Sequence, residues 1–297
     1  MEGKALLFKE YANIDAWPIC LDTQDADEIV ETVRRIAPVF GGINLEDIAA
    51  PRCFEVEARL QDLGIPVFHD DQHGTAIVLL AALINACRVL GRDPAKLRVV
   101  ISGAGAAGTA IAQLLRGVNF ADADWEPVED IVVCDSRGAI HAGRAGLSPE
   151  KEALLAYTNQ AAHTGSVHEV LEGADVFIGV SKGGLLAAGD IQRMAEAPII
   201  LAMANPEPEI MPDVALAAGA AIVGTGRSDF PNQVNNVLAF PGIFRGALDA
   251  GARVIDGAMK VAAAHALAAA VADPLPERIL PQPMDRSVAP LIAEGVR

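Results

Sequence analysis

The stretch Leu97-Arg98-Val99-Val100-Ile101-Ser102-Gly103-Ala104-Gly105-Ala106-Ala107-Gly108 decides the fold of this 297-residue chain. Its first half is typical of a buried strand, its second half matches G-x-G-x-x-G, and residues 109–115 continue as an apolar helix. Glycines in this turn let the backbone approach a pyrophosphate, whose charge the helix N-terminus stabilises. The stretch therefore predicts an α/β fold with a Rossmann-type, doubly wound parallel sheet that binds a dinucleotide.

The residues that follow predict four more strands, at Ile131–Cys134, Val176–Val180, Ile199–Met203 and Ala221–Gly224. Loops after two of these strands, containing Ser181 and Asn205, would lie along the cofactor. The candidate cofactor-binding residues are Gly103, Ala104, Gly105, Ala106, Ala107, Gly108, Asp135, Arg137, Ser181 and Asn205.

The choice between NAD and NADP depends on the end of the second strand. Asp135 is placed there to accept a hydrogen bond from a ribose hydroxyl, which favours NAD. Arg137 could instead hold the 2′-phosphate of NADP. We expect NAD on the strength of Asp135, with NADP left open.

Upstream, two acidic pairs lie in the stretches Gly41–Ile48 and His69–Thr75. The pattern around them predicts strands at Ile19–Asp22, Val39–Leu45 and Ile65–Phe68, separated by helices at Asp27–Ala37 and Pro51–Leu63 and followed by a helix at Thr75–Leu90. This βαβαβ order predicts a second, smaller parallel sheet with both pairs at the carboxyl ends of strands. Adjacent carboxylates among apolar neighbours suit a hard divalent ion such as Mg²⁺ or Mn²⁺.

Each of these signals has a simpler explanation. Either acidic pair could cap a helix N-terminus, and Lys4 could be an ordinary solvated lysine near a chain end. His69 and His73 are expected to be structural hydrogen-bonding residues, because a carboxylate-rich site for a hard ion does not need them. The occurrence of both pairs after successive strands is what favours a metal.

The chain divides into three parts by composition. The turn at residues 91–94 marks the end of a smaller α/β substrate and metal domain, residues 1–92. The Rossmann domain is expected over residues 93–260 and a C-terminal helical segment over residues 261–297, with an Ala-rich helix at residues 258–272.

Composition excludes several classes of protein. The chain is 52% hydrophobic and carries 39 acidic against 23 basic residues, a net charge of −16, without a Lys/Arg cluster that could follow a nucleic acid backbone. The apolar runs are too short to span a bilayer, and no signal peptide is visible. The four cysteines form no C-x-x-C pair and are expected to be reduced core residues. We expect a cytoplasmic protein.

Four stretches together resemble the malic enzymes, specifically the short bacterial type. They are Met1–Lys9, Phe40–Ile48, Ile65–Thr75 and Asn235–Gly242, and the resemblance covers essentially the whole chain. It implies oxidative decarboxylation of (S)-malate to pyruvate and CO₂ with reduction of NAD⁺ or NADP⁺. It also implies a homodimer or higher homo-oligomer.

The resemblance assigns roles to matching positions. It implies that Glu46, Asp47 and Asp71 hold Mg²⁺ or Mn²⁺, that Lys4 is the general base, and that Asp70 supports that lysine. Asn205 and Asn236, with Lys4, would contact the substrate or the nicotinamide end of the cofactor. To act as a base Lys4 must be neutral, so we expect burial and a nearby cation to lower its pKa.

The resemblance further implies an N-terminal segment, ahead of the lysine motif, that carries a tyrosine acting as general acid. Tyr11 and Tyr157 match neither that motif nor its position, so we expect the 297 residues to be incomplete for turnover. Two alternatives stay open: a non-catalytic NAD(P)-binding or regulatory derivative of the family, and a metal-free amino-acid dehydrogenase.

Overall fold

The computed structural model describes residues 1–118, 120 and 125–297. Its larger sheet has six strands in the order β5-β4-β3-β6-β7-β8, all parallel except the antiparallel pair β4-β5. The strands are β3 (Arg98–Ser102), β4 (Asp130–Asp135), β5 (Gly138–Ala139), β6 (Val176–Gly179), β7 (Ile199–Ala202) and β8 (Ile222–Thr225). The chain order reverses at β3, and doubly wound sheets bind their ligands at such a point.

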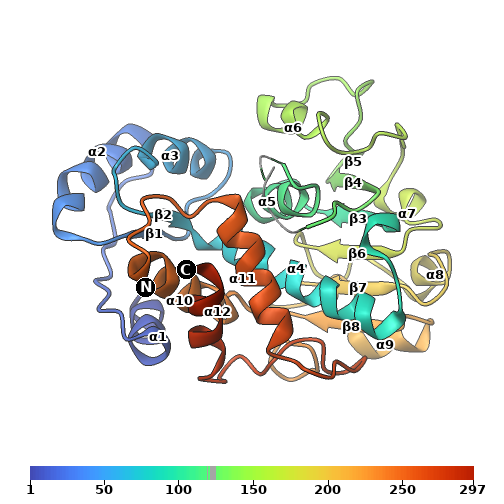
Figure 1. Cartoon of the computed structure of the whole chain (residues 1–297). Helices are drawn as coiled ribbons and strands as arrows, with labels where there is room; N and C mark the ends of the chain where they lie inside the picture. The colour runs from blue at the N-terminus through green and yellow to red at the C-terminus, as the bar shows by residue number, and fades with distance from the viewer. Residues whose placement is uncertain (119, 121–124) are drawn as a thin grey trace.

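Alternate residues of the central strands belong to two different cores. Val99 and Ile101 of β3 pack into the core that contains α4 (Asp70–Leu90) and α5 (Ala106–Leu115), whereas Val100 packs into the core on the opposite face. This second face is covered by short helices, α7 (Val167–Val170), α8 (Ala188–Ile191) and α9 (Pro212–Ala217), as Figure 1 shows. Helix α6 (Pro149–Leu154) lies beyond β5 at the edge of the sheet. The predicted Rossmann-type architecture is confirmed.

The smaller part contains a two-stranded parallel sheet, in which β1 (Ile43–Leu45) pairs with β2 (Val67–His69). Helices α2 (Ala26–Ile36) and α3 (Arg52–Leu60) pack on one another and on these strands, burying Ile29, Val33 and Val56. A short 3₁₀ turn at Ala37–Val39 connects α2 to β1. Helix α1 (Glu2–Ala12) precedes this unit and lies beside the C-terminal helices in Figure 1.

The last helices return to the start of the chain. Helix α10 (Phe240–Asp249) packs on α1, and α11 (Gly257–Ala269) packs on α4 and on α12 (Val288–Val296). The 3₁₀ turns Pro94–Lys96 and Asn236–Leu238 precede β3 and α10. Residue 260 lies inside α11, and the division into three parts stays a prediction.

Three predictions for the smaller part were wrong. Ile19–Asp22 has no regular structure, because Ile19 and Leu21 are exposed and no strand pairs with them. The strand predicted over Val39–Leu45 is reduced to Ile43–Leu45, because Pro38 fits the first turn of the 3₁₀ helix instead. The sheet is therefore β-α-β rather than βαβαβ.

Two further differences concern α4 and the cysteines. Helix α4 begins at Asp70 rather than Thr75, and by length and composition it alone among the described helices could cross a membrane. Its apolar residues are instead mostly buried against α5 and α11. Cys53, Cys87 and Cys134 are buried as expected, but Cys20 is exposed.

Candidate functional site

Lys4 joins two acidic residues that lie far from it in sequence. Its Nζ is 2.9 Å from Oε1 of Glu46 and makes a shorter contact with Oδ2 of Asp70. Lys4 lies in α1, Glu46 directly follows β1, and Asp70 directly follows β2. The resemblance, rather than the local spacing, pointed to this lysine, and the structure brings it to the ends of both strands.

The charge states of this pair follow from burial and proximity. Burial raises the pKa of the fully buried Asp70 to about 7, against the opposing effect of Lys4. Burial lowers the pKa of Lys4, but the carboxylates of Asp70 and Glu46 outweigh burial and raise it. This direction is opposite to the lowered pKa that the sequence analysis expected, because two carboxylates now face the ammonium.

One carboxylate oxygen of Asp70 accepts hydrogen bonds, whereas the other has no described partner. Its Oδ2 accepts a hydrogen bond from Asn236 Nδ2 at 2.6 Å, in addition to the contact with Lys4. Its buried Oδ1 has no hydrogen-bond partner among the described residues. Gly74, one turn further along α4, makes room for this carboxyl, since a Cβ there would lie 1.9 Å from Oδ1.

The two acidic pairs meet through backbone and side-chain contacts. Asp47 has a left-handed backbone, with φ of 58°, and its amide donates to Asp71 Oδ2 at 2.8 Å. Asn44 Nδ2 donates to Glu46 Oε2 at 2.9 Å. Across residues 1–118, 120 and 125–297, no group of three or more His, Cys, Asp or Glu side chains is arranged to hold a metal ion.

Sequence reasoning missed a buried set of hydrogen-bonded side chains centred on His73. Glu57 of α3 lies 2.8 Å from Nε2 of His73, and Lys260 of α11 lies 3.1 Å from Nδ1 of the same ring. His73 is thus a structural hydrogen-bonding residue, as predicted. The prediction was wrong for His69, whose buried ring nitrogens have no hydrogen-bond partner among the described residues and whose Nδ1 lies 3.9 Å from Asp71 Oδ2.

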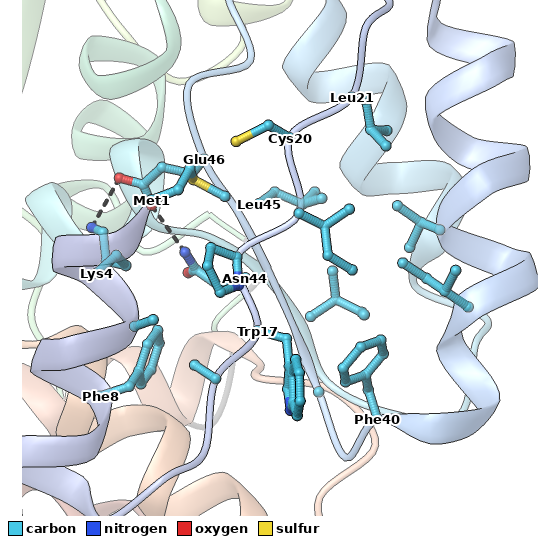
Figure 2. A pocket seen from close by; sticks show the side chains of 18 of the residues that line it. Met1, Lys4, Phe8, Trp17, Cys20, Leu21, Phe40, Asn44, Leu45 and Glu46 are labelled. Carbon is cyan, nitrogen blue, oxygen red and sulfur yellow. Dashed lines mark hydrogen bonds and ion pairs between the residues drawn. The ribbon is translucent and has the colours of Figure 1, made fainter.

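Figure 2 shows Lys4 and Asn44 both directed toward Glu46 at the edge of a cavity. This cavity has a volume of about 500 Å³ and is lined by α1, residues 14–23, α2 and the segment around β1. Most of its wall is apolar, and Trp17 in it is 75% exposed. The polar groups of the site therefore lie at one end of an apolar hollow.

The glycine-rich turn has the geometry that the motif predicted. Gly103 has φ of +122°, and a Cβ on Gly108 would lie 1.8 Å from the Gly103 carbonyl oxygen, so both positions require glycine. A Cβ on Gly105 would meet nothing within 4 Å. Ala104, Ala106 and Ala107 complete the turn, and α5 begins at Ala106. Gly105 therefore leaves open space at the helix N-terminus, where a pyrophosphate would bind.

Glu209 connects the two loops predicted to lie along the cofactor, and sequence reasoning missed it. Its fully buried carboxylate accepts hydrogen bonds from the amides of Ser181, at 2.9 Å, and Ala204, at 3.0 Å. Ser181 Oγ also lies 3.0 Å from Ser102 Oγ at the end of β3. Asn205 is exposed in its loop, and no described hydrogen bond joins it to Lys4 or the acidic pairs.

Asp135 ends β4 as predicted, but its carboxylate is paired with cationic side chains. Arg144 contacts both carboxylate oxygens at 2.5 Å, and Lys151 contacts Oδ2 at 2.6 Å. Burial raises the pKa of Asp135, but these partners and the Arg137 amide outweigh it and lower the pKa to about 2. Arg137 itself is exposed.

Comparison with known proteins agrees with this arrangement. Residues 72–296 match the family described as "Malic enzyme, NAD binding domain", and residues 1–61 match "Malic enzyme, N-terminal domain". The chain belongs to the malic enzyme family. The resemblance of its motifs to that family is confirmed.

Named malic enzymes resemble the chain along its whole length. It is 55% identical to the "Bifunctional malic/malolactic enzyme" of Bacillus subtilis, over 100% of this chain and 71% of that protein. It is 50% identical to the "NAD-dependent malic enzyme" of Geobacillus stearothermophilus, over 100% of this chain and 61% of that protein. The crystal structure of the NAD-dependent malic enzyme from Thermotoga maritima superposes with a TM-score of 0.93 at 43% identity, over 99% of this chain and 76% of that one.

The two tyrosines of this malic enzyme chain lie away from the acidic pairs. Tyr11 Oη contacts Met284 Sδ at 3.1 Å, and Tyr157 interacts with Gln113 in the Rossmann part. Neither makes a described contact with Lys4, Glu46 or Asp70.

Proposed function

We propose that this chain carries the site for oxidative decarboxylation of (S)-malate to pyruvate and CO₂, with reduction of NAD(P)⁺ and dependence on Mg²⁺ or Mn²⁺. The observation that carries the proposal is the contact of Lys4 with both Glu46 and Asp70. Three separate segments of a malic enzyme family member converge at this point, next to a Rossmann-type sheet.

Glu46, Asp47 and Asp71 are the residues that would hold the metal. Their carboxylate oxygens are the donors that hard divalent ions prefer, and the Asp47–Asp71 contact joins the two acidic pairs. A divalent cation held there would polarise the C2 hydroxyl of malate, stabilise the charge left after decarboxylation and lower the pKa of Lys4. These three carboxylates are not arranged around one point in the described structure, so the assignment of a metal to them rests on donor chemistry.

In this proposal Lys4 takes the proton of the C2 hydroxyl. In the ligand-free arrangement its ammonium is stabilised by Asp70 and Glu46, so it must lose a proton before Nζ can accept one from malate. Asp70 and Asn236 fix the position of Nζ and of the carboxyl beneath it. The loops held by Glu209 would align a bound nicotinamide, which would supply the acceptor for the hydride of C2.

Two more general proposals concern the location of the protein in the cell and its oligomeric state. We place the protein in the cytoplasm, supported by the bacterial relatives and by three buried cysteines whose thiol pKa burial raises to about 11 or 12. We also propose a homo-oligomer, supported by the exposed Trp17 beside the apolar cavity. Light scattering on the purified chain, with Trp17→Ser as comparison, tests the second of these.

The function is tested by malate-dependent formation of reduced cofactor with Mn²⁺, comparing wild type with Lys4→Ala. Loss of a general base lowers the rate by about 10²- to 10⁴-fold. Lys9→Ala is the matched control, because Lys9 lies on the same helix, is half exposed and pairs with Asp15. Equal rates in all three proteins would contradict the role of Lys4.

Other outcomes distinguish the alternatives. Cofactor binding without turnover in the wild type would agree both with a chain that is incomplete for turnover and with a non-catalytic derivative of the family. Metal-independent oxidation of an amino acid in place of malate would favour an amino-acid dehydrogenase.

A further inference from the structure

Helix α4 begins without a side-chain cap of its own, although its first turn carries two of the acidic residues. His69 is the N-cap residue and its side chain makes no capping hydrogen bond, while Asp70 and Asp71 occupy the first helical positions. The first amides of a helix have no partner within the helix, so an uncapped first turn tends to open. This acidic turn, residues 69–73, must therefore be held by another part of the chain.

Glu57 of α3 holds the acidic turn. Its Oε1 accepts from the amide of His69 at 3.2 Å, which is the bond that the glutamate of a capping box makes within its own helix. The ring Nε2 of His73 lies 2.8 and 2.9 Å from the two carboxylate oxygens, and Gln72 Nε2 donates to Oε2 at 3.3 Å. Every described hydrogen bond that the Glu57 carboxylate accepts thus comes from the acidic turn, and the side chain is only 13% exposed.

Lys260 of α11 contacts the same histidine through its other ring nitrogen. The Nζ of Lys260 lies 3.1 Å from Nδ1 of His73. The amino group donates and the Glu57 carboxylate only accepts, so one neutral tautomer of His73, with its proton on Nε2, satisfies both neighbours. The three side chains therefore form one continuous chain of hydrogen bonds between α3, α4 and α11.

The contacts of Glu57 differ in kind from those of the other partners of the two aspartates. Lys4 and the Asp47 amide meet carboxylate oxygens at the ends of the Asp70 and Asp71 side chains. Glu57 instead meets the N-cap amide and two side chains of the turn itself. A displacement of about 1 Å near a reacting group can cost about 10²-fold in rate. The backbone position of the acidic turn thus determines where both carboxylates lie.

We propose that Glu57 is a positioning residue of the acidic turn and that Lys260 fixes it through His73. Helices α3 and α11 thereby determine where the carboxylates of Asp70 and Asp71 lie. The effect on turnover rests on the proposed function, whereas the hold on the turn rests on these contacts alone.

Hydrogen exchange of the whole chain tests the hold on the turn. Glu57→Gln keeps the shape of the side chain but turns an NH₂ group toward donors, so exchange of the amides of residues 69–73 should become about tenfold faster. Lys260→Met keeps Glu57 in place and should accelerate the same amides by about threefold. Glu55→Gln is the matched control for the first variant, because Glu55 lies on the same helix and is 55% exposed. Lys96→Met is the control for the second, because Lys96 is 82% exposed.

Steady-state turnover with malate and Mn²⁺ separates positioning from mere stabilisation. When the acidic turn shifts, kcat should fall by about tenfold in Glu57→Gln and by about threefold in Lys260→Met. The KM for the dinucleotide should stay within about twofold, because no described hydrogen bond joins either side chain to the glycine-rich turn. The double variant should be at most about twofold slower than Glu57→Gln, since both changes break the same chain of contacts.

The outcomes decide each part. Unchanged exchange at residues 69–73 in either variant overturns the role of that residue, and so does an equal acceleration in α2, which would show only a loss of overall stability. Faster exchange confined to the turn, with kcat unchanged, overturns the positioning role while leaving the proposed function intact. If the wild type does not turn over malate, only the proposed function is affected, and the exchange measurement decides whether Glu57 and Lys260 hold the turn. Thermal unfolding checks that each variant folds, and Lys260→Met alone decides the proposal if Glu57→Gln does not.

Discussion

Asp70 and Asp135 both lie at the carboxyl end of a parallel strand, yet their surroundings give them opposite properties. Asp70 is fully buried, and burial raises its pKa to about 7. Asp135 is also largely buried, but hydrogen bonds from Arg144, Lys151 and the Arg137 amide hold its pKa at about 2. The same residue type at the same place in two sheets therefore has a raised pKa in one part and a lowered pKa in the other.

The number of donors around each carboxylate explains the difference. Asp70 meets Lys4 and Asn236 through one oxygen, and its second oxygen has no partner among the described residues. Asp135 uses both oxygens twice. A carboxylate with an unused buried oxygen can respond to a ligand, whereas a saturated one serves as an anchor for neighbouring cations.

The largest expected effect comes from exchanging each carboxylate for its amide. Asp70→Asn keeps the shape but removes the charge that positions Lys4, so malate-dependent turnover should fall by about 10²-fold or more. Asp135→Asn, measured at saturating cofactor, should keep kcat within about threefold, since Asp135 does not meet the reacting atoms. If Asp70→Asn keeps more than a tenth of the wild-type kcat, the contrast between the two sites fails.

The second prediction compares two glycines of the turn, one that faces open space and one that is packed against the backbone. Gly105→Ala adds a methyl group where nothing lies within 4 Å, so thermal stability should hardly change while NADPH affinity falls by about tenfold or more. Gly108→Ala places a Cβ 1.8 Å from a backbone oxygen and should cost about 1–3 kcal/mol of stability. Fluorescence titration and urea unfolding measure the two effects. Unchanged NADPH affinity in Gly105→Ala would mean that the open space at the turn is not where the dinucleotide binds.

Most of the fold could be predicted from local sequence patterns. The strand, glycines and helix of residues 97–115 could be predicted because periodicity and positive φ are properties of neighbouring residues. The strand predicted at Ile19–Asp22 failed for the opposite reason, because a strand needs a partner that its own sequence does not contain. The pattern of apolar residues indicates which segments could form strands, but not which of them pair in a sheet.

The missing site residues are long-range partners. Glu209 lies 28 residues from Ser181, and Lys260 lies 187 residues from His73, so no spacing rule connects them. Arg144 and Lys151 follow Asp135 by 9 and 16 residues across a turn and a short helix. Lys4 was found through family resemblance because its environment forms only when α1 reaches the ends of β1 and β2.

A third, smaller effect concerns the loops that Glu209 holds. Glu209→Gln replaces one of two buried acceptor oxygens with a donor that faces the amide of Ser181 or Ala204, which should cost about 1–3 kcal/mol in unfolding free energy. Glu207→Gln is the control, since Glu207 is exposed in the same loop. Equal stability of both variants in urea would show that the carboxylate does not brace the loops.

The smallest expected effect is the acid dependence that Asp135 confers. Its pKa is lowered from 3.8 to about 2, so the carboxylate stabilises the folded state above about pH 4 and loses that contribution as the pH falls through about 2. The shift corresponds to an effect on the order of 2 kcal/mol, of which about half is lost by pH 3. The stability gap between wild type and Asp135→Asn should therefore narrow by about 1 kcal/mol between pH 6 and pH 3 in urea unfolding.

Asp229→Asn removes an exposed carboxylate that pairs with Arg227 and should show a smaller change, because solvent screens that pair. A gap that stays constant with pH would mean that Asp135 is not held by its cations, and the contrast with Asp70 would then rest on burial alone.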